Sequence, residues 1–423
     1  MRKFAVAAAL TCILITTSTN YVWSAGFALY NYSSTSIARG GAVIAHNEDP
    51  SALFFNPALM NKLEPQVKVG INYLKNSAEF TSDATGATFK LTDTSHYIPT
   101  LFAIHRINDS ISAGIGIFSN FGLSTTWDDR WEGRYLATHS ELKTITYNPA
   151  VSFKITPKVF IAGGISISML DAELNRNYNS ELFAPGFSLP DIKQKLTGDD
   201  TALGYNAGFL ADLTDDVSLG ISYRSSMKVE MNGEVEHQVS PVLASFFPDT
   251  SASTAVNLPP QAFAGIAYRG IDSFVFELSV TWEGWSKYDE LKINLDQPVV
   301  TATSITIPKN WKDVYPLGFS AQYRVNDIFK LNAGYTYDPT PVPDDTFEPS
   351  LPGTDGHTFA LGLDIEHQNI RVGTFYAYKM NKDRSKNNDL DDSALDGLNP
   401  MTSANGTYKS SVHMTGIDVA YVF

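Results

Sequence analysis

The feature that most constrains this sequence is a period-two alternation of apolar and polar residues, which recurs from about residue 66 to the end of the chain. Apolar side chains occupy every second position in several segments, among them 111–117, 274–282, 329–337 and 359–365. Successive residues of a β-strand point to opposite faces, so each segment has one apolar face and one polar face. The pattern predicts an all-β chain built from amphipathic strands.

The connections between these segments alternate between short turns and long polar loops. Turn signals fall at 108–109, 156–157, 215–216, 270–272, 326–327 and 367–369, and long loops are expected at about 76–86, 120–140, 171–199, 232–255, 284–312, 339–355 and 380–407. Six turns and seven loops make thirteen connections and therefore fourteen strands. Short turns at one end and long loops at the other are typical of a bacterial outer-membrane barrel.

A large soluble β-sandwich would also alternate, because it buries one face of each sheet and exposes the other to water. The chain, however, ends on an alternating segment whose last residue is the aromatic Phe423. A terminal strand leaves no unpaired edge only if the sheet closes on itself. Together with the strand count and the N-terminal signal described next, this favours a closed fourteen-stranded antiparallel transmembrane barrel.

The first 24 residues have the pattern of a secretory signal peptide. Two basic residues precede twelve mostly apolar residues at 4–15, too few for a bilayer-spanning helix, which needs about 20. Cleavage is expected near Ser24/Ala25, and the alternative is a short N-terminal anchor. Cys12 is the only cysteine in the chain, so the mature protein is expected to contain no disulfide, no cysteine-ligated metal and no thiol nucleophile.

The charge balance argues against binding to nucleic acid. The chain carries 31 basic and 45 acidic residues, a formal net charge of −14, whereas a nucleic-acid-binding surface needs a basic stripe. Aromatic residues make up 12% of the chain, which is too many for a disordered protein.

Residues 25–65 do not follow the strand pattern. They are rich in Ser, Ala, Gly and Asn, and 33–45 could hold one short helix. Because the lumen of a fourteen-stranded barrel is too wide to be filled by its own side chains, we expect a compact plug here, and the apolar cluster at 53–60 argues against a solvated tail. The predicted organisation is a signal peptide at 1–24, an N-terminal hatch at 25–65 and a barrel at 66–423.

Short motifs follow one another along the whole mature chain. They are AGF at 25–27, SST at 33–35, ARG at 38–40, NPA at 56–58, FGLST at 121–125, WEGRY at 131–135, NPA at 148–150, GISYRS at 220–225, WEGWS at 282–286 and YTYD at 335–338. In these motifs the sequence resembles the FadL/OmpP1/TodX family, outer-membrane transporters of long-chain fatty acids and other hydrophobic compounds. The resemblance implies a monomeric barrel in the bacterial outer membrane, with a hatch and with sideways passage through a gap where the third strand bends inward.

The resemblance also suggests where the functional residues lie. The hatch motif is Asn56, Pro57 and Ala58, which we expect to couple hatch movement to the gap. The gap is expected at Phe118, Phe121, Gly122 and Leu123. A capture groove is expected between two loops, at Leu182, Phe183, Phe187, Leu189, Val242, Leu243, Phe246 and Phe247, with packing of the loops on each other as the alternative.

A fatty carboxylate needs a basic partner, because an unpaired buried charge is costly. The candidates are Arg39, Arg224 and Arg324. At the top of the fifth strand, Asp171 and Glu173 precede Arg176, and we expect no clamp there. The sequence therefore leaves open whether the substrate is a fatty acid or an aromatic hydrocarbon.

Functions of a different class are an adhesin or phage receptor and an outer-membrane hydrolase. The sequence contains no G-x-S-x-G and no H-E-x-x-H motif, and its eight histidines are not spaced like metal ligands. The acidic loop at 387–396 lacks calcium-loop spacing and is expected to be solvated. We therefore expect no enzyme activity, no catalytic residues, no cofactor and no metal, with a hydrophobic small molecule and outer-membrane lipid as partners.

Overall fold

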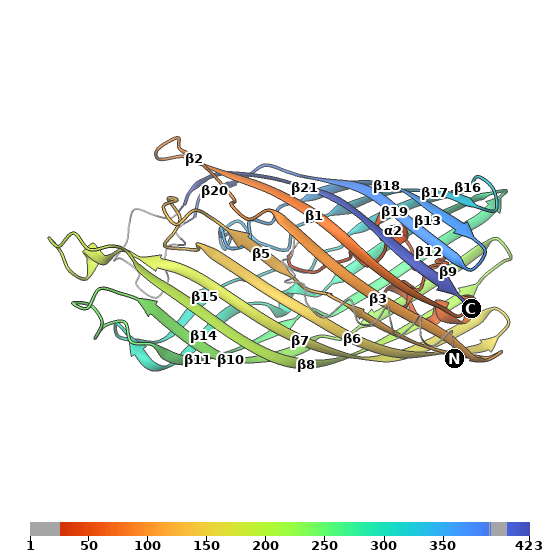
Figure 1. Cartoon of the computed structure of the whole chain (residues 1–423), viewed down its shortest axis with the longest axis horizontal. Coiled ribbons are helices and arrows are strands. Elements are labelled where there is room, and N and C mark those ends of the chain that lie inside the picture. The colour runs from red at the N-terminus through yellow and green to blue at the C-terminus, as the bar shows by residue number, and fades with distance from the viewer. Residues whose placement is uncertain (1–25, 389, 391–403) are drawn as a thin grey trace.

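The computed structural model describes residues 26–388, 390 and 404–423, and the chain forms a closed antiparallel barrel (Figure 1). The predicted signal peptide with its cleavage site, and most of the acidic loop at 387–396, lie outside the described residues. Among the residues described, no helix has the length and apolar character needed to cross a membrane.

The wall has fourteen strands, which confirms the predicted fold, and several of them are broken into two segments. In chain order they are β1 (Gln66–Ser82), β3 (Ser95–Asn108), β4 (Ile111–Phe118) with β5 (Leu123–Thr126), β6 (His139–Thr156), β7 (Val159–Tyr178), β8 (Ile192–Asp212), β9 (Val217–Arg224) with β10 (Met227–Gln238), β11 (Thr250–Leu258) with β12 (Gln261–Ile271), β13 (Phe274–Glu283) with β14 (Glu290–Val299), β15 (Ala302–Pro308) with β16 (Leu317–Arg324), β17 (Phe329–Asp338), β18 (Gly356–His367), β19 (Ile370–Asn381) and β21 (Gly406–Val422). Two short strands, β2 (Thr88–Lys90) and β20 (Arg384–Lys386), pair with β1 and β21.

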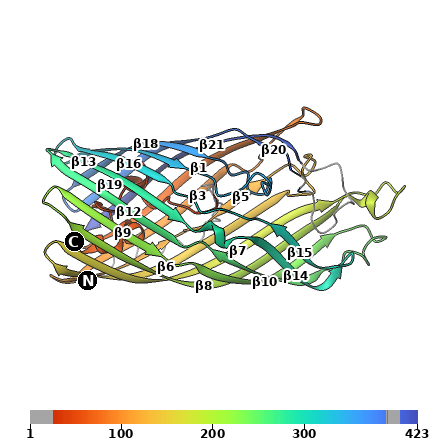
Figure 2. The same ribbon diagram turned by 180° about the vertical axis from the view of Figure 1, so that it is seen from behind.

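The barrel closes between the first and last strands. Every residue of β1 pairs with β21, from Gln66 opposite Val422 to Ser82 opposite Gly406. This ladder leaves neither strand as a free edge. The strands run obliquely to the long axis in both views (Figures 1 and 2), with the short turns and the C-terminus at one end, here called the turn end, and the long connections at the other, the loop end.

The two faces of the wall differ as the alternation predicts. Large apolar side chains face outward and are exposed, among them Leu203, Leu278, Leu331, Phe359 and Leu361. Many positions between them carry buried polar or charged side chains, such as Asn332, Asp364 and Asp418. An apolar exterior around a polar interior is the arrangement expected of a barrel in a membrane.

The six short turns fall where the sequence predicts them, but several long loops are shorter than expected. β7 and β8 stay paired up to Tyr178 and Ile192, well inside the predicted loop at 171–199. Near the loop end, outward positions of these strands carry charges such as Lys193 and Lys195 instead of apolar residues. The apolar alternation therefore ends before the backbone ladder does, as expected where strands extend beyond a membrane.

The hatch lies inside the barrel and consists of α2 (Ser34–Ala38), α3 (Ala52–Phe55) and the 3₁₀ helix η1 (Pro57–Lys62). Ser33 begins α2 with a capping box, and Asn56 caps η1 ahead of Pro57, whose ring suits a first helical position. The helix α2 contacts β17, β18, β19 and β21, whereas η1 contacts β4, β6, β7 and β8. The hatch therefore spans the lumen from one side of the wall to the other.

Buried ion pairs attach the hatch to the wall. Lys68 of β1 binds both Asp49 of the hatch and, at 2.7 Å, Asp418 of β21. Arg39 lies 3.7 Å from Glu277 of β13. Removing one partner of a buried pair leaves an uncompensated charge, so such pairs hold the hatch in one position.

Candidate functional site

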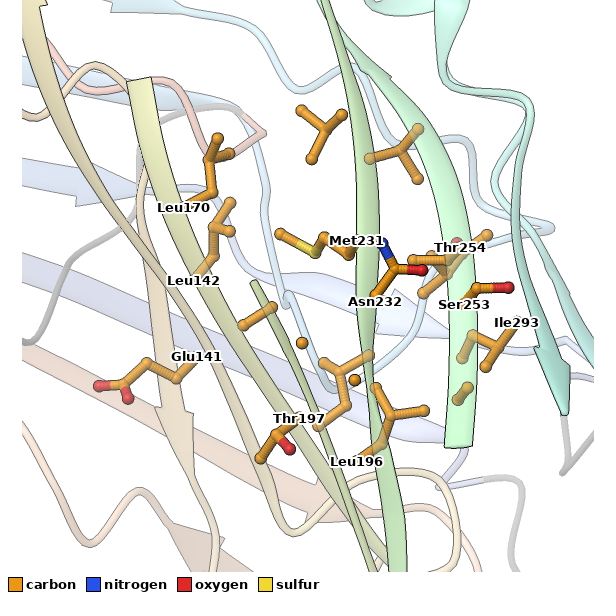
Figure 3. A pocket seen from close by; sticks show the side chains of 18 of the residues that line it. Glu141, Leu142, Leu170, Leu196, Thr197, Met231, Asn232, Ser253, Thr254 and Ile293 are labelled. Carbon is orange, nitrogen blue, oxygen red and sulfur yellow. The ribbon is translucent and has the colours of Figure 1, made fainter. Parts of the chain in front are cut away.

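An apolar cavity occupies the part of the lumen nearer the loop end. Its volume is about 120 Å³, and it adjoins a second cavity of about 110 Å³ with which it shares Phe27, Leu123, Leu174, Leu196, Tyr288, Leu291 and Ile293. We call the two together the chamber. Figure 3 shows Leu142 and Leu170 facing Met231 across the space, while the carboxylate of Glu141 points away from it.

The inner face of β7 supplies much of the chamber wall. Leu170, Ala172 and Leu174 line it at alternate positions, and Arg176 follows in the same series. The intervening acidic residues belong to the opposite face, where Glu173 pairs with Lys195. The acidic residues that precede Arg176 in the sequence therefore do not neutralise it.

Two cationic side chains, Arg176 and Lys309, line the second cavity of the chamber. The Nε of Arg176 donates to Oε1 of Gln194 at 3.1 Å and its second terminal nitrogen donates to the hydroxyl of Tyr178 at 2.5 Å. Within the part of the chain that the structure describes, Arg176 forms no ion pair. The neighbouring Lys309, by contrast, is paired with Glu348.

The N-terminal segment 27–29 runs along the third wall strand, and its Phe27 lines the chamber. The ring of Phe27 packs 4.7 Å from that of Trp285 and 6.0 Å from that of Phe121. A Cβ on the preceding Gly26 would lie 2.6 Å from the indole of Trp285, and the φ of Gly26 is +72°, so only glycine fits here. Phe27 is thus held at the chamber floor by the fixed backbone at Gly26 and by edge-to-face packing of aromatic rings.

The third wall strand is interrupted between β4 and β5. The interruption pairs with the N-terminal segment instead of with β3: the Leu29 N–H donates to the Asn120 carbonyl at 3.0 Å, and the Gly122 N–H donates to the Phe27 carbonyl at 2.8 Å. On its other side, the Thr144 hydroxyl donates to the Phe121 carbonyl at 2.6 Å. The strand is therefore drawn toward the lumen at this point.

The interruption leaves a stretch of the second wall strand without a backbone ladder to the third, here called the window. The β3–β4 ladder ends at Leu101 opposite Ile117, and the described ladders pair the six residues 95–100 of β3 with β1 only. Beyond them, Thr92 rejoins the third strand by donating its N–H to the Thr126 carbonyl at 2.9 Å. Pro99 stands inside this stretch, and a proline, which has no N–H, is tolerated where a strand has no second neighbour. The window is roughly 20 Å long at about 3.3 Å per residue.

The four residues predicted at the gap all lie beside the window. Phe118 ends β4, Phe121 and Gly122 lie in the interruption, and Leu123 begins β5 and also lines the chamber. Leu123 therefore lies at the boundary between the chamber and the window. The role of these residues in passage stays a prediction.

The hatch motif is bonded to the wall at β8. The side-chain nitrogen of Asn56 donates to the carbonyls of Ile44 and Phe209, both at 3.0 Å, and its oxygen accepts from the Ala58 N–H at 3.1 Å. Two residues earlier, the ring of Phe54 packs 5.3 Å from that of Phe118 at the base of the window. This path of contacts is the one along which the motif could act on the window.

A substitution in the wall should loosen this docking. A Cβ on Gly208 would lie 2.5 Å from Oδ1 of Asn56 and 2.9 Å from Cδ of Pro57. We expect Gly208→Val to displace the motif and to destabilise the docked hatch by about 1–3 kcal/mol, the usual effect of overpacking. Limited proteolysis of folded barrels should then cleave within the hatch faster than in the wild type.

Gly163→Val is the matched control, because the nearest atom to a Cβ on Gly163 is 3.9 Å away. Equal proteolysis rates for the two valine variants would contradict the docking role assigned to Gly208.

The two loops predicted to form a capture groove pack against each other. Leu243 and Phe247 are buried, and the ring of Phe183 packs edge-on at 4.9 Å against that of Phe247. Leu182 and Leu189 are partly buried, whereas Phe187, Val242 and Phe246 are exposed. The same apolar cluster includes Leu174, Leu196 and Ile293 of the chamber wall, so it connects the outer surface with the chamber.

The three predicted carboxylate partners do not line the chamber. Arg39 is paired with Glu277. Arg224 donates to Ser166 at 2.9 Å and lies 4.4 Å above the ring of Phe54. Arg324 is half-exposed, 3.9 Å from Glu48. The structure instead brings Arg176 to the chamber, and the alternation of β7 is the sequence signal that could have identified it.

Comparison with known proteins gives one consistent result. A family model described as "Outer membrane protein transport protein (OMPP1/FadL/TodX)" matches residues 15–423. The chain is 27% identical over 410 residues to the long-chain fatty acid transport protein of Escherichia coli O6:H1, covering 88% of this chain and 90% of that protein. It is 26% identical to the 47 kDa outer membrane protein of Pasteurella multocida, covering 95% and 94% of the two chains.

Two crystal structures share the fold. A Pseudomonas aeruginosa FadL homologue superposes with a TM-score of 0.81 at 20% identity, covering 94% of this chain and all of the other. The P. putida toluene transporter TodX superposes with a TM-score of 0.71 at 15% identity, covering 93% and 98%. The family model, the E. coli relative and TodX are named for transport and not for an enzyme activity, which agrees with the prediction for this chain.

Proposed function

The chain belongs to the OMPP1/FadL/TodX family of outer membrane transport proteins, and from this premise we propose that it takes up long-chain fatty acids and releases them sideways through the window. The bacterial outer membrane is its location, as for its relatives. The loop end then faces the cell exterior and the turn end faces the periplasm.

The observation that carries the choice of substrate is Arg176 in the wall of an apolar chamber. A chain of about 16 carbons gains on the order of 13 kcal/mol when it leaves water for an apolar slot, at about 0.8 kcal/mol per CH₂. Its carboxylate loses water at the same time and needs a charged hydrogen-bond partner. Arg176 can supply that partner because no acidic residue among those described is paired with it. An aromatic hydrocarbon has no carboxylate with which this cation could pair.

The route follows the connected apolar surfaces. The exposed Phe187, Val242 and Phe246 make the first contact, and the cluster beneath them leads into the chamber. Movement of Phe27 away from Phe121 would open the chamber floor toward the window. The cargo then reaches the membrane without crossing the hatch, which the buried ion pairs hold in the lumen.

Uptake of labelled oleate by bacteria that lack their own transporter tests this proposal. Cells producing the protein should show saturable uptake above that of cells carrying an empty plasmid, with the amount of protein in the outer membrane measured in parallel. Absence of oleate uptake, together with uptake of labelled toluene by correctly inserted protein, would overturn the fatty-acid proposal in favour of a hydrocarbon channel.

A further inference from the structure

Two buried polar side chains at the window have nitrogen atoms without a hydrogen-bond partner among the described residues. They are Asn76 of β1, whose Nδ2 is unpartnered, and His96 of β3, of which both ring nitrogens are unpartnered. Asn76 is 1% exposed and His96 is fully buried. Neither residue takes part in the chamber or in the hatch contacts described above.

The β1–β3 ladder places the two side chains next to each other. His96 lies opposite Leu74, and Asn76 is two residues further along β1 on the same inner face. Diagonal neighbours of this kind are about 7–8 Å apart between their Cα atoms, within reach of side chains as long as these. His96 also belongs to the six residues of β3 that border the window. His96 therefore borders the window on the inner face of the wall, and Asn76 lies beside it on the next strand.

The surroundings make the unpartnered nitrogens costly. Leu74, Ile98 and Phe121 belong to one apolar cluster around this part of the wall. A buried donor without a partner keeps its full desolvation penalty, so almost every such group in a folded protein has a partner. Two adjacent polar residues at this place indicate a partner that is present only for part of the working cycle.

We propose that Asn76 and His96 bind the carboxyl group of the cargo at the window, as the molecule passes from the chamber to the membrane. This inference rests on the proposed uptake of fatty acids. The amide N–H₂ of Asn76 and an N–H of the imidazole can each donate to one carboxylate oxygen. The carboxyl group that leaves Arg176 is thereby received by two neutral donors before it reaches the lipid headgroups, and a hydrocarbon offers these donors nothing to bind.

The double variant Asn76→Leu/His96→Leu tests the site with two substrates of equal chain length, labelled oleate and labelled 1-octadecene. We expect oleate uptake to fall about tenfold, as for the loss of hydrogen bonds to a charged group, and octadecene uptake to stay unchanged. The affinity of the purified variant for oleate should equal that of the wild type, because the chamber is intact. The single variant His96→Gln keeps a hydrogen-bond donor at position 96 and the native Asn76. It should therefore take up oleate faster than the double variant.

Tyr97→Phe is the matched control, since Tyr97 is the neighbour of His96 on the exposed outer face. An unchanged rate of oleate uptake in the double variant, or an equal fall for both substrates, would overturn the site while leaving the proposed function in place. A wild-type protein that takes up no oleate would overturn the proposed function itself, and this site with it.

Discussion

Deletion of the single residue Asn120 should abolish uptake while leaving the chamber able to bind its ligand. The expectation follows from the register on either side of the window. Phe118 lies opposite Thr146, and Leu123 lies opposite Leu142. Between these two pairs the third strand advances by five residues, whereas β6 advances by only four. The extra residue makes the interruption a bulge, which turns the strand away from its ladder.

Removing that residue makes the third strand and β6 advance by the same number of residues between the two pairs. Phe118 and Leu123 then keep their inward orientation within one continuous strand, and β5 can run alongside residues 95–100 of β3. The deletion also removes the carbonyl that accepts the Leu29 N–H, which frees the N-terminal segment from the third strand. A straightened third strand closes the wall, and the cargo loses its exit.

Uptake of oleate and equilibrium binding of oleate to purified protein together measure this result. The variant should bind oleate but transport it no faster than cells without the protein. Deletion of Gly86 is the control, because it lies in an exposed loop outside the proposed route, where a Cβ on it would meet nothing within 4 Å. Wild-type transport by the Asn120 deletion, at equal surface amounts, would show that the window is not the exit.

Arg176→Leu should weaken oleate binding by about 10- to 150-fold, since hydrogen bonds to charged groups contribute roughly 1.5–3 kcal/mol. The apolar lining of the chamber is unchanged, so binding of a neutral hydrocarbon of the same length should not weaken. Arg176→Lys keeps the charge but loses the planar contact with Gln194 and Tyr178. Its affinity for oleate should therefore lie between those of the wild type and Arg176→Leu.

Isothermal titration of detergent-solubilised protein gives these affinities directly. Arg324→Leu serves as the control for the loss of one positive charge, because Arg324 is half-exposed and outside the chamber. Equal affinities of wild type and Arg176→Leu for oleate would show that the carboxylate is held elsewhere.

The sequence was sufficient to predict the barrel because its signal is repeated in every strand. A period-two pattern determines which residues share a face, and the alternation of short and long connections determines the strand count and the two ends. The same pattern also contained the position of Arg176. Reading Asp171 and Glu173 as its neighbours ignored that residues five and three positions away lie on the other face of a strand.

Other parts of the site have no local signal. The bulge at the window exists only relative to β6, and its extra residue is visible only when the register of two strands is known. Lys68 meets Asp418 across the closure of the barrel, 350 positions away in the chain. The unpartnered nitrogens of Asn76 and His96 likewise depend on what the fold leaves around them. Such features require the three-dimensional arrangement.

The ladder between β1 and β21 has a consequence for the stability of the closed barrel. The hatch precedes β1 in the chain, yet it lies inside a wall whose last seam is made by the final strand. Asp418, on that strand, binds both Lys68 and the Ser34 N–H of the hatch. The strand that closes the barrel is therefore held in place partly by a segment that precedes the first strand, so the stability of the seam depends on the docked hatch.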